Sequence, residues 1–209
     1  MENRQKIKKA YKDISVVGRA LPLSLKQVGD QAGLSLEEVR EVFPGSLDIQ
    51  REIWEDYLRT TLEALEASPE FAEYLVREKM LGFYFTFFEL LGEDREFIML
   101  FKDQLGVWNY NPEFMKSFKP AFLEFVSMLL AEGAATEEVA ERMIFGNEYP
   151  GWHWPQILYL LNGWLNDTSS GYTKTDQAIE KSVNLGFDIM GRNLFDSAFD
   201  FMKFVVTQR

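Results

Sequence analysis

Apolar residues recur at helical spacing along nearly the whole chain. The first segment places four of them on one face of a helix expected over residues 3–17: Ile7, Ala10, Tyr11 and Ile14. No run of residues alternates between apolar and polar and is then closed by a hairpin turn, as a β-sheet would require. The pattern therefore predicts an all-α fold.

Two short helices with clear start signals follow the first one. Ser24 is placed to cap a helix over residues 25–31, which ends at Gly33. Ser35 and Glu38, three residues apart, form a capping box for the next helix. Two short helices joined by a tight glycine turn are typical of a helix-turn-helix, whose second helix enters the major groove of DNA. The N-terminal region therefore predicts a three-helix unit of this kind.

The remainder of the chain predicts a larger helical bundle. Further amphipathic helices are expected over residues 47–67, 69–91, 94–104, 112–132, 136–145, 153–165 and 174–206. Loops between the later helices are expected at residues 106–112, 146–151 and 166–173. We therefore expect two domains, a helix-turn-helix domain over residues 1–46 and a helical domain over residues 47–209.

The chain offers few residues for catalysis or metal binding. It has no cysteine and one histidine, His153, which excludes disulfides, iron–sulfur clusters and thiolate zinc sites. The sequence also lacks a glycine-rich phosphate loop and a Gly-x-Ser-x-Gly elbow. Its many carboxylates have no histidine or cysteine near them in sequence. We therefore predict no enzymatic activity, no catalytic residue, no metal and no cofactor.

Charge is distributed unevenly along the chain. The net charge is −11, yet residues 1–35 hold seven Lys and Arg against three Asp and Glu. The acidic remainder argues against nucleic-acid binding, whereas the basic first segment argues for it. The polar N-terminus carries no apolar export signal, and the longest apolar stretch, near residues 81–91, is too short to span a bilayer. We therefore expect a cytoplasmic protein without a membrane span.

Three short segments of the N-terminal region match one known family. They are Ile7-x-x-Ala10-Tyr11, Ser24-Leu-Lys-Gln-Val-Gly-Asp-Gln-Ala-Gly-Leu-Ser35 and Phe43-Pro44. With them, residues 1–55 resemble the tetracycline-repressor (TetR) family of transcriptional regulators, although Gly29 stands where that family usually has alanine. The resemblance implies a homodimer, paired through its last two helices, that binds double-stranded DNA and responds to an apolar small-molecule effector.

The resemblance also implies which residues lie nearest the DNA. They are Lys6, Lys8, Lys9, Ser24, Lys26, Ser35, Leu36, Glu37 and Arg40. The helix that would read the bases shows Glu37, Glu38 and Glu41 against one Arg40, and this charge balance is unfavourable next to phosphates. The lysines of the first helix either compensate for it or form a solvated helix face.

Aromatic residues dominate the stretch at 81–91, which forms either a packed core or the wall of a cavity. By the resemblance, a ligand cavity would be lined by five residues: Phe83, Phe87, Trp108, Phe118 and His153. For Trp108 and Phe118 the alternative is that they only pack against the walls, and for His153 it is a packed and hydrogen-bonded position. A second hypothesis therefore remains, in which the TetR fold is kept without DNA reading and the protein binds a lipid or another apolar small molecule.

Overall fold

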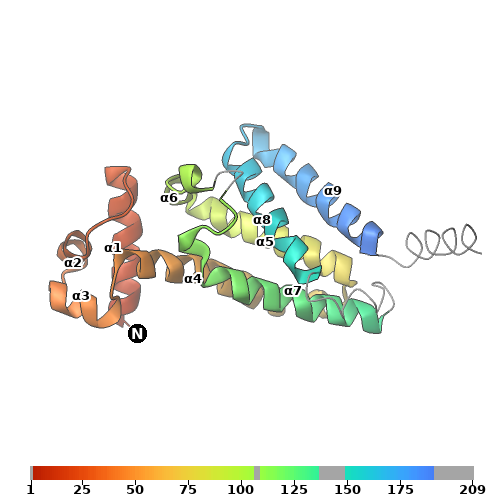
Figure 1. The fold of residues 1–209 in the computed structure, drawn as a ribbon, viewed down its shortest axis with the longest axis horizontal. Helices are drawn as coiled ribbons and strands as arrows, with labels where there is room; N and C mark the ends of the chain where they lie inside the picture. Colours follow the sequence, from red (N-terminus) through yellow and green to blue (C-terminus); the bar gives the residue numbers. More distant parts are fainter. Residues whose placement is uncertain (1, 106–108, 137–148, 191–209) are drawn as a thin grey trace, which may run out of the picture. The chain divides into compact units, whose positions relative to one another are not determined.

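The structure, a computed structural model, describes residues 2–105, 109–136 and 149–190 (Figure 1). Every regular element in these ranges is an α-helix or a short 3-10 helix. The all-α prediction is therefore confirmed for the described part of the chain. None of the helices in these ranges combines the length and the apolar character needed to cross a membrane.

The first three helices pack together as a small head. They are α1 (Glu2–Gly18), α2 (Leu25–Ala32) and α3 (Leu36–Val42), and α1 contacts both of the others. Ile7 and Tyr11 of α1 are fully buried, as are Val28 of α2 and Val39 of α3. Ile7, Ala10 and Tyr11 of the apolar face that the sequence predicts for the first helix are therefore buried in the core.

The helix starts in the head follow the predicted capping. The Ser24 hydroxyl accepts a hydrogen bond from the backbone N–H of Gln27, whose side chain accepts one from the Ser24 N–H. Ser35 and Glu38 form the same reciprocal box. Between them, Gly33 adopts a left-handed conformation with φ of 70°, which glycine takes without a steric penalty. Local side chains therefore fix both helix starts and the turn.

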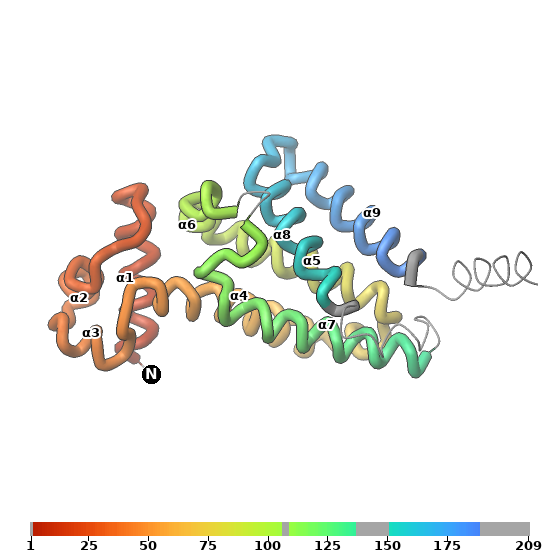
Figure 2. Tube along the Cα trace, viewed as in Figure 1, coloured from red at the N-terminus to blue at the C-terminus, as the bar shows by residue number. Residues whose placement is uncertain are grey.

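The remaining helices follow in chain order (Figure 2). They are α4 (Ser46–Glu66), η1 (Pro69–Glu73), α5 (Val76–Glu93), α6 (Arg95–Met99), η2 (Lys102–Gln104), η3 (Glu113–Met115), α7 (Phe118–Ala135), α8 (Tyr149–Leu165), η5 (Ser170–Tyr172) and α9 (Thr173–Met190). α8 and α9 contact each other and run in opposite directions.

Several expected helices differ from the observed ones. The helices expected at 69–91, 94–104 and 112–132 are each divided into a 3-10 turn and an α-helix. In the first of them, Tyr74 has an extended backbone, with φ of −67° and ψ of 144°. Helical periodicity continues across such a break, so the pattern alone does not reveal it.

The expected loop at 146–151 is wrong at its end, because α8 already begins at Tyr149. Pro150 then falls in the first turn, where its missing N–H costs no helical hydrogen bond. The helix expected at 136–145 and the end of the one expected at 174–206 lie outside the described residues.

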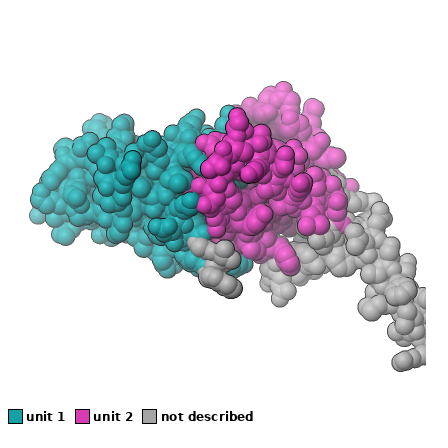
Figure 3. All heavy atoms as spheres, turned by 90° about the horizontal axis from the view of Figure 1, so that it is seen from above, with its two compact units in different colours: residues 1–64, 86–121 teal, residues 65–85, 122–209 magenta. Residues whose placement is uncertain are grey.

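The contacts between Cα atoms divide the chain into two compact units (Figure 3). The first contains residues 1–64 and 86–121, and the second contains residues 65–85 and 122–209. The first unit thus joins the head to α6 and to parts of α4 and α5. The boundary expected after residue 46 separates a DNA-binding part from a ligand-binding part. The division into compact units does not test this boundary, which stays a prediction.

Candidate DNA-binding head and aromatic interior

α3 turns an apolar face inward and a polar face outward. Val39 is fully buried and Phe43 is 2% exposed, whereas Glu37, Arg40 and Glu41 are exposed. Among the described residues, Arg40 forms no salt bridge. The outward face of α3 is therefore accessible and carries both acidic and basic groups.

Glu38 takes part in the cap of α3, so it adds less negative charge to the outward face than the sequence suggests. Its carboxylate accepts a hydrogen bond of 2.8 Å from the Ser35 backbone N–H. This bond, together with the Ser35 hydroxyl, lowers the pKa of the Glu38 carboxyl. The carboxylate is therefore directed at the start of the helix, and Glu37 and Glu41 remain as the outward acids.

The surroundings of Gly29 explain why this chain has glycine where the resembling family usually has alanine. A Cβ at this position would lie 2.8 Å from the Leu34 carbonyl oxygen and 3.2 Å from Val39 Cγ2. Both distances are shorter than ordinary van der Waals contact, and the first neighbour is backbone. α2 therefore approaches the start of α3 so closely that this position has no room for a methyl group.

The outward lysines of the head are each paired with a carboxylate one helical turn away. Lys6 lies 2.6 Å from Glu2, Lys9 lies 2.7 Å from Asp13, and Lys26 lies 2.7 Å from Asp30. These three lysines are exposed, so water and salt weaken the pairs and DNA phosphates can compete for the ammonium groups. They remain suitable for phosphate contacts, although the local charge that they present is reduced.

Lys8 differs from the other lysines because it is only 4% exposed. Its ammonium group lies 3.0 Å from a Glu52 carboxylate oxygen and also pairs with Asp56, both on α4. Arg4, one turn earlier on α1, pairs with Glu52 as well. The expected DNA contact at Lys8 therefore does not fit its position, because this side chain joins α1 to α4 inside the first unit.

Asp94, between α5 and α6, connects three elements of the first unit. The same carboxylate oxygen lies 2.5 Å from Lys12 Nζ on α1 and accepts a 2.7 Å hydrogen bond from the Tyr57 hydroxyl on α4. Burial and the Asp94 hydrogen bond raise the pKa of Tyr57, so its hydroxyl stays protonated and donates. Asp94, Glu52 and Asp56 were not predicted from the sequence. The four-residue spacing of cations on α1 and acids on α4 was the available signal.

Trp54 is the centre of an aromatic cluster in the first unit. Its ring centroid lies 5.9 Å from that of Tyr57, 5.7 Å from Phe101, 5.1 Å from Phe114 and 6.4 Å from Phe118. Most of these pairs are edge-on, a favourable arrangement for ring quadrupoles. The cluster joins α4 and α7 to the segment around η2 and η3.

Further ring contacts extend this cluster toward the head. Phe118 lies 5.6 Å from Phe87 of α5, and both are fully buried. Phe101 lies 5.3 Å from Phe97 of α6, which lies 6.4 Å from Tyr11 of α1. Two of the expected ligand residues therefore meet in one cluster, and edge-on ring contacts connect that cluster to the first helix of the head.

The second unit has its own aromatic cluster, which contains Phe83. Its ring lies 5.5 Å from Phe122 and 4.9 Å from Phe125 of α7, and 5.4 Å from Tyr84. Phe122 also lies 6.5 Å from Trp154 of α8. Phe83 is fully buried among these rings, and Trp108, another expected ligand residue, lies outside the described residues.

Two buried polar groups in the aromatic interior have no hydrogen-bond partner among the described residues. They are the indole N–H of Trp54 in the first unit and the hydroxyl of Tyr84 in the second. Burial raises the pKa of Tyr84, so the hydroxyl keeps its proton. A buried donor without an acceptor is unfavourable, and each of these groups could therefore bind an acceptor atom of an apolar ligand.

His153 lies in the core of the second unit, 4% exposed. Its Nδ1 lies 2.8 Å from Gln156 Oε1, and Gln156 Nε2 donates a 3.1 Å hydrogen bond to Ser182 Oγ of α9. Because the Gln156 oxygen accepts, Nδ1 carries the hydrogen. Burial lowers the pKa of His153, so the ring is neutral near pH 7. These contacts match the packed, hydrogen-bonded alternative.

No group of three or more metal-ligating side chains is assembled within the described ranges. The candidate functional features of this part are the exposed face of α3, the paired lysines of α1 and α2, and the aromatic clusters of the two units.

Comparison with known proteins places these features in a family. A family model described as the tetracyclin repressor-like C-terminal domain matches residues 79–205. The chain belongs to the TetR family. The C-terminal region therefore matches the same family that the N-terminal motifs resemble.

Solved structures agree with this assignment at the level of the fold. A TetR family transcription regulator from Shewanella sp. PV-4 superposes with a TM-score of 0.63 and 14% identity, over 90% of this chain and 97% of that one. The fatty acid degradation regulator FadR from Bacillus halodurans gives a TM-score of 0.59 and 14% identity, over 88% and 95% of the two chains. No protein with curated annotation matches the sequence. The TetR fold of this chain is that of transcriptional regulators.

Proposed function

We propose that this TetR-family protein is a ligand-responsive transcriptional regulator that binds operator DNA as a homodimer. The observation that carries the proposal is the geometry of α3. Its cap at Ser35, its buried face at Val39 and its exposed face around Arg40 together form a helix presented to solvent on a fixed support. A helix-turn-helix uses such a surface to enter the major groove.

The proposed DNA contacts divide into two sets. Lys6, Lys9 and Lys26 would contact phosphates, since their ammonium groups are exposed. The residues proposed near the bases and the adjoining backbone are Ser24, Ser35, Leu36, Glu37 and Arg40. Lys8 is omitted because it is buried against Glu52 and Asp56.

An apolar effector would bind in the aromatic interior. In the first unit the buried rings offer apolar surface, and the unpartnered indole N–H of Trp54 would fix the orientation of a ligand that carries an acceptor oxygen. The first-unit cluster includes Phe87 and Phe118 and extends to Tyr11 of α1. Occupation of this cluster would therefore be transmitted to the head by direct packing.

The salt dependence of DNA binding tests this proposal. Fluorescence anisotropy with mixed duplex DNA, from about 20 to 200 mM salt, should give a steep negative slope of log affinity against log salt. The variant Arg40→Ala should lower affinity for a selected operator, while Arg59→Ala on α4, which is also exposed, should leave it unchanged. No binding at low salt would contradict the proposal.

A second function is favoured by the charges around α3. The outward lysines are all paired, and Glu37 and Glu41 face solvent beside Arg40. A TetR-family protein that no longer reads DNA would retain its aromatic interior for a lipid or another apolar small molecule. In that case duplex DNA would not bind at any salt concentration, whereas a solvatochromic fatty-acid probe would still bind.

A regulator that binds operator DNA must be in the compartment that holds the genome, so the proposed function agrees with the expected cytoplasmic location. It needs no catalytic group, since its output is a change in DNA affinity.

A further inference from the structure

α8 presents a line of exposed residues at intervals of seven. Trp152 is 75% exposed and Tyr159 is 66% exposed, and Asn166, directly after the helix, is exposed as well. Residues seven apart lie on nearly the same side of an α-helix. The helix contains no Asp, Glu, Lys or Arg between Tyr149 and Leu165. Large exposed aromatic side chains on an uncharged helix are typical of a protein interface.

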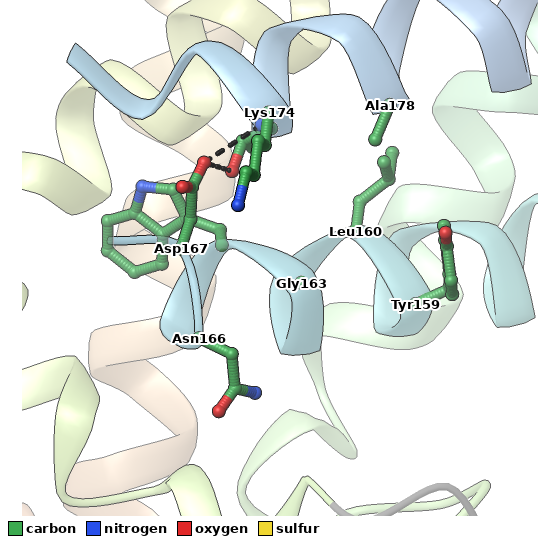
Figure 4. A pocket seen from close by; sticks show the side chains of 9 residues that line it. Tyr159, Leu160, Gly163, Asn166, Asp167, Lys174 and Ala178 are labelled. Atoms are coloured by element: carbon green, nitrogen blue, oxygen red, sulfur yellow. Dashed lines mark hydrogen bonds between the residues drawn. The ribbon is translucent and has the colours of Figure 1, made fainter. Parts of the chain in front are cut away.

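A cavity of about 230 Å³ opens on the same side of α8 (Figure 4). It lies over Gly163, with Tyr159 and Asn166 beside it on α8, and Lys174 and Ala178 opposite on α9. A Cβ at Gly163 would have no neighbour within 4 Å. The missing side chain therefore leaves the floor of the cavity open.

The turn between α8 and α9 holds the cavity in shape. The Asp167 carboxylate accepts hydrogen bonds from the backbone N–H and hydroxyl of Ser169, at 2.8 and 2.6 Å. It also accepts bonds from the N–H and hydroxyl of Thr175, at 2.9 and 2.7 Å. These bonds keep the pKa of Asp167 well below its usual range. The cavity is therefore preformed, which favours binding of a rigid group.

Trp152 and Asn166, which lies at the far edge of the cavity, are equally distant from Tyr159 along the chain. Trp152 precedes Tyr159 by seven residues, and Asn166 at the edge of the cavity follows it by seven. In a twofold interface, residue i of one copy meets residue j of the other, and the reverse contact also forms. Two antiparallel α8 helices that cross at Tyr159 would therefore bring each Trp152 to the cavity of the other copy.

The lining of the cavity contains a cation that an indole ring can contact. Lys174 places a positive charge at the edge of the cavity (Figure 4). The face of an indole ring carries the negative part of its quadrupole and attracts an ammonium group. Leu160 and Trp164 add apolar surface to the lining, so the cavity offers both contacts that a tryptophan side chain requires.

We propose that Trp152 of each copy inserts into the cavity over Gly163 of the other copy, and that this contact sets the register of the homodimer. The inference rests on the homodimer of the proposed function and adds the residues that form its contact. Tyr159 then lies on the twofold axis, where it meets the partner's Tyr159.

Disulfide cross-linking tests the register directly, because the chain contains no cysteine. In the Tyr159→Cys variant, the new cysteine should form a disulfide with the same cysteine of the other copy under mild oxidation. Trp152→Cys mixed with Asn166→Cys should give a mixed dimer, and neither should cross-link alone. Met128→Cys, at an exposed position of α7 in the same unit, serves as the control and should stay uncross-linked.

Sedimentation tests the contribution of the contact to affinity. Trp152→Ala and Gly163→Leu should each raise the dimer dissociation constant about 30-fold, as loss of an interface hot spot does. The double variant should be no weaker than the weaker single variant, because both substitutions remove the same contact. Tyr74→Ala, at an exposed aromatic residue outside this face, should leave the constant unchanged.

The outcomes separate this inference from the proposed function. A wild-type chain that sediments as a monomer would overturn both the homodimer and the inserted Trp152. A stable dimer without the Tyr159→Cys cross-link, or with additive effects of Trp152→Ala and Gly163→Leu, would overturn the inference and leave the homodimer in place.

Discussion

Gly29 shows how one missing methyl group sets the distance between two helices. Its position within α2 would normally favour alanine, which is the better helix former by about 1 kcal/mol. Here the Leu34 carbonyl oxygen occupies the place that a Cβ would need. The sequence identifies the residue as unusual, but the reason lies in the turn between α2 and α3, which folds back onto it.

We expect Gly29→Ala to lower the free energy of unfolding by about 1–2 kcal/mol. Overpacking typically costs about 1–3 kcal/mol, and the gain in helix propensity offsets part of it. Gly92→Ala in α5 is the control, since a Cβ there meets nothing within 4 Å and should stabilise the fold slightly. Urea denaturation of both variants checks the prediction, and stabilisation by Gly29→Ala would contradict it.

His153 adds a pH dependence at the same scale. Burial lowers its pKa in the folded state below the ordinary value of 6.5, so the unfolded chain binds a proton that the folded chain does not. The free energy of unfolding should therefore fall as the pH drops below about 6.5, by up to about 1.4 kcal/mol per pH unit.

His153→Gln removes this titration and should give a flatter dependence between pH 7.5 and pH 5.5. Denaturation at both pH values measures the difference between the variant and the wild type. Equal slopes for the two proteins would show that His153 does not titrate as described.

At the scale of single elements, α1 combines two kinds of lysine on one helix. Lys9 is 77% exposed and pairs with Asp13 on α1 itself, whereas the Lys8 side chain is 5% exposed and pairs with two acids of α4. The sequence contains the lysines of both kinds in one run. It does not reveal which of them face α4, because that depends on how α1 lies across the longer helix.

Lys8→Met should therefore destabilise the protein by about 2 kcal/mol, because it leaves Glu52 and Asp56 without their buried partner. Lys9→Met should cost no more than about 0.5 kcal/mol, as expected for an exposed pair one turn apart. Thermal unfolding of both variants measures the difference. Similar losses for the two would show that Lys8 is not held as described.

Local signals predicted much of the element structure, and long-range contacts explain the rest. Ser24, Gly33 and Ser35 fixed the boundaries of α2 and α3 from sequence, since caps and turns depend on nearby residues. The break at Tyr74 was missed, because the periodicity of the flanking segments continues through it. Of the expected ligand residues, Phe87 and Phe118 meet, while Phe83 packs in another cluster.

At the scale of the whole molecule, the proposed function requires that a ligand bound among the buried rings change the orientation of the head. Within the first unit, two connections reach α1. One is the aromatic chain from Phe118 to Tyr11, and the other is the Asp94 carboxylate between Lys12 and Tyr57. They reach α1 at neighbouring positions, Tyr11 and Lys12, so they are placed to change its orientation.

We expect Asp94→Asn to loosen α1, because the neutral amide keeps an acceptor for Tyr57 but loses the ion pair with Lys12. Amide hydrogen exchange of residues 2–18 should accelerate severalfold, since partly buried pairs stabilise local structure by about 1 kcal/mol. Asp103→Asn changes the net charge equally at an exposed position and should leave that exchange unchanged. Equal exchange in the two variants would contradict this connection.

The edge-on packing of the rings around Trp54 also has an optical consequence. Trp54 and Phe101 meet at an interplanar angle of 89°, and Trp54 and Phe118 meet at 87°. Chromophores held in such a fixed, asymmetric arrangement produce near-ultraviolet circular dichroism, which vanishes when side-chain packing becomes fluid. The protein therefore carries its own spectroscopic probe in the cluster whose rings reach Tyr11 of the first helix, and any compound that enters the cluster should change the ellipticity of that band without an added label.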